Sequence, residues 1–147
     1  MLRSLKPLVI VLFCVAFAGC QKYTSGLVQS AGRADEAVVL SNLKSIMLAE
    51  TAYNLSNGDY GTFEQLTNGG FLDARFKGER PSLSQYSYTI TIREKSADAA
   101  TASYSCNADP ERTGDRAGRH FYIDSTSNAI HFNGTQAASA TDEIIKP

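Results

Sequence analysis

The sequence lacks the features that identify several common classes of protein. Its 147 residues include only three cysteines, Cys14, Cys20 and Cys106, too few for a disulfide framework or a cysteine-based zinc site. No apolar run reaches the roughly 20 residues that a membrane-spanning helix needs. The motifs of serine hydrolases, phosphate loops and dinucleotide-binding folds are also missing. We therefore expect neither an enzyme nor any catalytic residue.

Positive charge is not in excess either. The formal net charge is −1, and the basic residues do not gather in one segment. Proteins that bind nucleic acids neutralise phosphates with clustered Lys and Arg side chains. The sequence therefore predicts no nucleic-acid partner.

The N-terminal 19 residues have the order of parts of an export signal. Arg3 and Lys6 precede an uncharged apolar run, Leu8–Ala18, and small residues stand just before Cys20. We interpret residues 1–19 as a signal peptide, followed at 20–33 by a tether or the frayed start of a helix. An ordinary signal cut after Gly19, with Cys20 unmodified, is the alternative.

The stretch Phe17-Ala18-Gly19-Cys20 resembles the lipobox of bacterial lipoproteins, with Phe17 where that family usually has an aliphatic residue. The resemblance implies that Cys20 is lipidated and anchors an exported protein to a membrane. Gln21 resembles the outer-membrane sorting class, which implies a location on the outer membrane, facing the periplasm. Cys106 would then be alone, either as a buried thiol or in an intermolecular disulfide.

Residues 34–134 are expected to form one globular domain that begins with a long helix. Helical spacing of apolar residues predicts this helix from about Ala31 to Ser56, and Asn57-Gly58 is a stop signal. A capping box is expected at Thr62–Gln65. The predicted apolar face consists of Val39, Leu43, Ile46, Met47 and Tyr53. The predicted solvent face consists of Asp35, Glu36, Lys44 and Glu50.

The second half of the chain predicts a four-stranded antiparallel sheet. Tyr86–Arg93 alternates with period two, with Ser87, Thr89 and Thr91 on its polar face. Three further strands are expected at 100–106, 119–123 and 129–132, and 135–147 is expected to be a weakly ordered tail. A long helix packed on such a sheet is an α+β fold.

Two parts of this domain resemble type IV pilins and type II secretion pseudopilins. The helix end and the following loop are similar at Asn42–Ile46, Ala49–Tyr53 and Gly58–Thr62, continuing into Gln65-Leu66. The last β-hairpin is similar at Gly118–Asp124 and Ala129-Ile130. The resemblance implies a pilin-like head.

The N-terminus departs from the pilin pattern. Pilins have a Gly-Phe processing site, a glutamate five residues into the mature chain and a long apolar helix, and none of these is found here. We therefore expect a pilin-like interaction domain on a lipid anchor, with a protein partner in the envelope, accessory to a secretion or pilus system. The alternatives are a filament subunit of such a system and a small envelope enzyme or metal-binding protein.

Two pairs of side chains are candidates for binding sites. Tyr86 and Tyr88 form an aromatic stripe, which is either core packing or a partner surface, since surface tyrosines favour interfaces. His120 and His131 either share a zinc or copper ion or are two polar residues on a half-exposed sheet. Their spacing indicates no third ligand, and we expect no such metal.

An acidic loop is the remaining candidate. Asp109, Glu111 and Asp115 supply the oxygen ligands that Ca²⁺ prefers. The resemblance to major pseudopilins, which hold calcium in a comparable late loop, permits a Ca²⁺ site. Arg112 and Arg116 in the same loop favour the alternative, a solvated loop of mixed charge.

Overall fold

The computed structural model describes residues 20–96, 101–112 and 118–146, with side chains from residue 35 onward. The signal peptide predicted for residues 1–19 lies outside the described part. Within the described part, no helix is both long enough and apolar enough to cross a membrane.

The chain divides into two compact units, Met1–Ala34 and Asp35–Pro147. Helix α2 (Cys20–Asn57) begins in the first unit. Residues 20–33, for which a tether and the start of a helix were both open, are helical. The second unit contains the rest of α2 and all the other elements.

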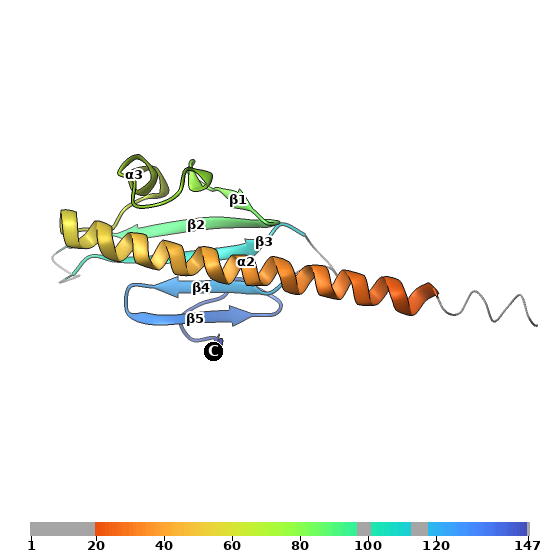
Figure 1. Cartoon of the computed structure of the whole chain (residues 1–147). Coiled ribbons are helices and arrows are strands. Elements are labelled where there is room, and N and C mark those ends of the chain that lie inside the picture. The colour runs from red at the N-terminus through yellow and green to blue at the C-terminus, as the bar shows by residue number, and fades with distance from the viewer. Residues whose placement is uncertain (1–19, 97–100, 113–117, 147) are drawn as a thin grey trace, which may run out of the picture. The chain divides into compact units, whose positions relative to one another are not determined.

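The Asp35–Pro147 unit is an α+β fold, as predicted, with α2 on one face of an antiparallel sheet (Figure 1). The sheet has six strands rather than four, and their order along the chain is also their order in the sheet. The strands are β1 (Ser82–Leu83), β2 (Tyr86–Arg93), β3 (Ser103–Pro110), β4 (His120–Asp124), β5 (Ser127–Asn133) and β6 (Glu143–Ile144).

The sheet differs from the prediction mainly at its two edges. β1 and β6 have only two residues each, too short for any alternation to be visible in the sequence. β3 continues to Pro110, through residues that we expected to lie in a loop. Its polar residues pair with β2 over the full length of both strands, so backbone pairing extends where composition favoured a turn.

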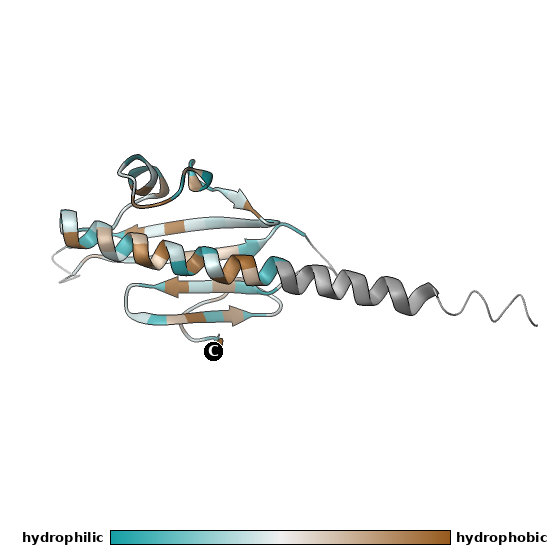
Figure 2. Ribbon diagram, in the orientation of Figure 1, coloured by the Kyte–Doolittle hydropathy of each residue, from teal (hydrophilic) through white to brown (hydrophobic). Residues whose placement is uncertain are grey.

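The core lies between α2 and the facing side of the sheet. Val39, Leu43 and Ile46 of α2 are completely buried, as their spacing predicts. They pack in one cluster with residues of β2, β3 and β4. Figure 2 shows apolar residues recurring along α2 and on the strands beside it. When these two apolar surfaces pack together, their area is removed from water. This burial drives the packing of the helix on the sheet.

The prediction that Glu50 faces solvent is wrong. Its side chain is 0% exposed, and its Oε2 accepts a hydrogen bond of 2.9 Å from the backbone N–H of Gly61. Gly61 is itself buried, and a Cβ there would lie 3.0 Å from the Leu66 side chain. A side chain at residue 61 would therefore crowd Leu66 and Tyr53, and glycine avoids this crowding.

The connection after α2 follows the predicted order. Gly58 has a φ of +79°, the left-handed conformation that commonly ends helices. Thr62 and Gln65 form the expected capping box at the start of α3 (Phe63–Asn68). A short 3₁₀ helix, η1 (Ala74–Phe76), then leads to β1 and buries Phe76.

In place of the weakly ordered tail expected at 135–147, the chain crosses the outer side of the sheet and adds β6. Asn107 Nδ2 donates to the carbonyl of Ala138 at 2.8 Å, and Ala138 is buried. His131 Nδ1 lies 2.8 Å from the carbonyl oxygen of Asp142. These polar contacts hold a segment whose composition alone indicated disorder.

Candidate functional site

The aromatic stripe lies in the core, so it is not a partner surface. Tyr86 is 2% exposed and Tyr88 is 0% exposed. The Tyr88 hydroxyl accepts a hydrogen bond of 3.0 Å from Asn42 Nδ2 on α2. Burial raises the pKa of Tyr88 to about 12, so its phenol is neutral at physiological pH. Of our two interpretations of this stripe, core packing is the correct one.

The two histidines bind different partners. His120 Nδ1 lies 2.7 Å from Asp109 Oδ1, and His131 Nδ1 faces the Asp142 carbonyl oxygen. Asp109 also belongs to the predicted calcium loop, where its carboxylate is thus engaged with His120. Each of these contacts satisfies a polar group on the outer side of the sheet.

Only part of the predicted calcium loop lies within the described residues. Asp115 lies outside the described residues, and the backbone N–H of Glu111 donates to the Gln85 carbonyl at 2.8 Å. Over residues 20–96, 101–112 and 118–146, no three His, Cys, Asp or Glu side chains are grouped so as to hold a metal ion.

Cys106 is a free thiol that is completely buried, which agrees with the first of its two predicted roles. Burial raises the pKa of this thiol, with a smaller contribution from Glu50, so it remains protonated and unreactive. Cys20 is the first residue of α2. Its side chain is outside the described part, and its lipidation remains a prediction.

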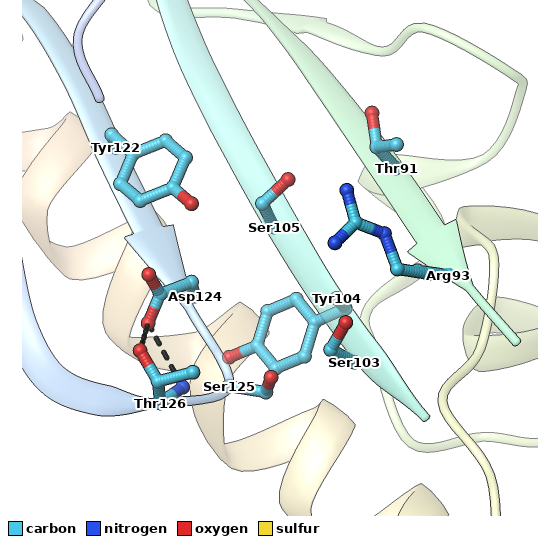
Figure 3. Close-up of a pocket in the computed structure, with 9 residues that line it drawn as sticks. All are labelled: Thr91, Arg93, Ser103, Tyr104, Ser105, Tyr122, Asp124, Ser125 and Thr126. Atoms are coloured by element: carbon cyan, nitrogen blue, oxygen red, sulfur yellow. Dashed lines mark hydrogen bonds between the residues drawn. The ribbon is translucent and has the colours of Figure 1, made fainter. Parts of the chain in front are cut away.

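A polar groove lies on the side of the sheet opposite α2 (Figure 3). It has a volume of about 200 Å³ and crosses β2, β3 and β4. We call it the outer-face groove and define it by Thr91, Arg93, Ser105, Tyr122, Asp124 and Thr126.

Strand register aligns these side chains. Thr91 of β2 is directly opposite Ser105 of β3, and Ser105 is directly opposite Asp124 of β4. Side chains at directly opposed positions lie on the same face of a sheet. Thr91, Ser105 and Asp124 therefore form a polar row across three strands. The polar alternation around Thr91 was the only sequence signal for this site.

Asp124 fixes the turn between β4 and β5, which forms one wall of the groove. Its Oδ1 accepts bonds from the backbone N–H groups of Thr126 at 2.9 Å and Ser127 at 3.0 Å, and from the Thr126 hydroxyl at 2.8 Å. Burial alone raises the pKa of Asp124, but these bonds outweigh it and hold the pKa below its ordinary value. Asp124 therefore keeps its negative charge at neutral pH.

Arg93 supplies positive charge at the opposite wall. Its side chain extends over the groove, toward Ser105 (Figure 3). The ion pairs found among the described residues involve Arg75, Arg119 and His120, and Arg93 is in none of them. The groove thus places an unpaired guanidinium opposite hydroxyl groups and a buried carboxylate.

Comparisons of this chain with protein-family models, with curated proteins and with solved structures found no significant match.

Proposed function

We propose that this chain is a lipid-anchored protein of a bacterial cell envelope, whose α+β domain is a pilin-like module that binds a protein partner. It is exported, attached through Cys20 to the outer membrane, and faces the periplasm. It has no catalytic activity of its own and acts as an accessory of a secretion or pilus system.

The observation that supports this proposal most directly concerns α2. This helix begins at Cys20, the cysteine of the lipobox-like stretch, and it supplies Val39, Leu43 and Ile46 to the core of the domain. One long helix packed on an antiparallel sheet is the arrangement that the resemblance to pilins implies. The lipobox-like stretch supports a different membrane attachment from the long apolar helix of pilins.

Intact mass spectrometry of the chain extracted from membranes tests the anchor. We expect a mature chain that begins at Cys20 and carries added acyl mass, because each buried CH₂ of an acyl chain contributes about 0.8 kcal/mol to membrane binding. The Cys20→Ala variant should lose this mass and leave the membrane fraction. The matched Cys106→Ala variant should keep it, since Cys106 is buried in the fold.

A mass that corresponds to an unmodified chain would overturn the lipid anchor. Purification of the wild-type chain as a polymer from cells would instead overturn the accessory role, because it would identify a filament subunit. A discrete lipidated species that crosslinks in intact cells to a protein of a secretion or pilus system is the result that we expect.

A further inference from the structure

The two ends of the outer-face groove offer opposite hydrogen-bonding capacity. The Arg93 guanidinium has only N–H donors, in a planar fork that matches carboxylate and phosphate oxygens. At the other end, Thr126 donates its hydroxyl proton to Asp124, so its oxygen lone pairs remain as acceptors. A ligand that satisfies both ends therefore carries an anion at one end and donors at the other.

The spacing of the strands limits how compact such a ligand can be. Arg93 is on β2 and Thr126 follows β4, with β3 between them. Adjacent strands are about 4.8 Å apart, so the backbones on the two sides are separated by roughly 10 Å. The Arg93 side chain extends over the groove from β2, so its guanidinium covers part of this separation. A ring that bears one anionic group and several hydroxyl groups can contact Arg93, the middle strand and Thr126 at once.

The size of the groove sets an upper limit on the bound group. Its volume of about 200 Å³ is below the roughly 300–1,000 Å³ of pockets that enclose drug-sized molecules. It therefore accommodates one ring, either free or at the end of a longer chain. The hydroxyls of Thr91, Ser105 and Tyr122 both donate and accept, as sugar hydroxyls do.

We propose that the outer-face groove binds an acidic sugar, with the carboxylate or phosphate at Arg93 and the sugar hydroxyls on Ser105, Tyr122 and Thr126. This inference does not depend on the lipid anchor or on a protein partner. Asp124 is a positioning residue here, because it holds the Thr126 wall in place and repels an anion bound in the reverse orientation.

The test is a titration of the ¹⁵N-labelled full chain, in detergent, with glucuronate, glucose 1-phosphate and glucose. We expect at least one charged sugar to shift the amide signals of Thr91, Ser105 and Thr126. Tighter binding of glucuronate assigns a carboxylate, and tighter binding of glucose 1-phosphate assigns a phosphate. Glucose should bind roughly tenfold or more weakly, because the charge-assisted bond to Arg93 is missing.

Two variants separate the site from general charge effects. Arg93→Gln should weaken binding of the charged sugar roughly tenfold and remove most of its salt dependence. Arg75→Gln removes an exposed arginine that pairs with Asp73, outside the groove, and should leave binding unchanged. Equal binding of glucose and the charged sugars, equal affinity of the Arg93→Gln variant, or shifts confined to other amides would each overturn the proposal.

Discussion

Glu50 Oε2 accepts the backbone N–H of Gly61 at 2.9 Å, which joins the last turns of α2 to the loop before α3. The other oxygen, Oε1, is buried and has no hydrogen-bond partner among the residues that the structure describes. Burial raises the pKa of Glu50 to about 7, Gly61 opposes this rise, and the negative charge of Asp59 adds to it. The carboxyl is therefore half protonated near neutral pH, in the core of the domain.

Stability should fall as the pH rises from about 4.5 to about 7. In this range the folded state keeps the Glu50 proton while the unfolded state releases it, so folding binds a proton and becomes less favourable at higher pH. The gap between the ordinary pKa and the folded value of about 7 corresponds to about 3 kcal/mol. Urea unfolding at several pH values measures this loss.

Glu50→Gln isolates the effect of this one group. The amide oxygen can still accept the Gly61 N–H, but the side chain cannot ionise. We expect the variant to gain stability relative to the wild type as the pH rises, and the difference to level off above pH 7. Parallel stability curves for the two proteins would show that Glu50 ionises normally in the folded state.

The Cys106 thiol should be protected from modification. It is completely buried and its pKa is raised, so an alkylating agent reaches it only when the fold opens. We expect maleimide to react at least about a hundredfold more slowly in buffer than in urea with a chain in which Cys14→Ala and Cys20→Ala leave Cys106 as the sole cysteine. Mass spectrometry over time gives both rates. Fast labelling in buffer would show that the β3 core is open to solvent.

The Asn42–Tyr88 hydrogen bond should contribute measurably to stability. Tyr88→Phe removes the acceptor of Asn42 Nδ2, which is left unsatisfied in the core. A loss of about 1–3 kcal/mol in the free energy of unfolding is expected. Adding Asn42→Leu should recover part of this loss, since both polar groups are then absent. Tyr53→Phe, on a partly exposed ring, is the control and should change stability by less than about 0.5 kcal/mol.

The turn between β1 and β2 offers a stabilising substitution. Ser84 and Gln85 have φ values of +53° and +65°, which Asn and Gly adopt more easily than Ser or Gln. Ser84→Asn should raise the free energy of unfolding by about 0.5 kcal/mol. Ser82→Asn, in the neighbouring strand, should give no such gain in the same thermal unfolding assay. Equal melting temperatures for Ser84→Asn and the wild type would contradict the assignment of strain to this turn.

Sequence patterns predicted the parts of the fold that depend on periodicity. The helical spacing of Val39, Leu43 and Ile46 and the alternation of Tyr86–Arg93 each gave the correct element. Both signals arise because one face of the element is buried. The prediction for Glu50 was wrong because an acidic residue is ordinarily assigned to the solvent face. The hydrogen bond that Glu50 accepts from a loop N–H depends on tertiary contacts, which periodicity does not indicate.

The outer-face groove was beyond sequence analysis for a similar reason. Its residues come from β2, β3, β4 and the β4–β5 turn, and only strand register brings Thr91, Ser105 and Asp124 into one row. Composition does not specify register. The two short edge strands were also missed, because Ser82–Leu83 and Glu143–Ile144 are held by pairing with neighbours rather than by a pattern of their own.

The brevity of β1 and β6 has a consequence for solubility. Exposed sheet edges act as templates for strands of other molecules, and short edge strands leave little backbone for such templating. Deleting residues 135–147 would remove β6, which pairs with His131 and Phe132, and would leave the whole outer edge of β5 (Ser127–Asn133) without a partner strand. A shortened chain would then be prone to aggregate through β5, so affinity tags belong beyond Pro147, with the C-terminal segment kept whole.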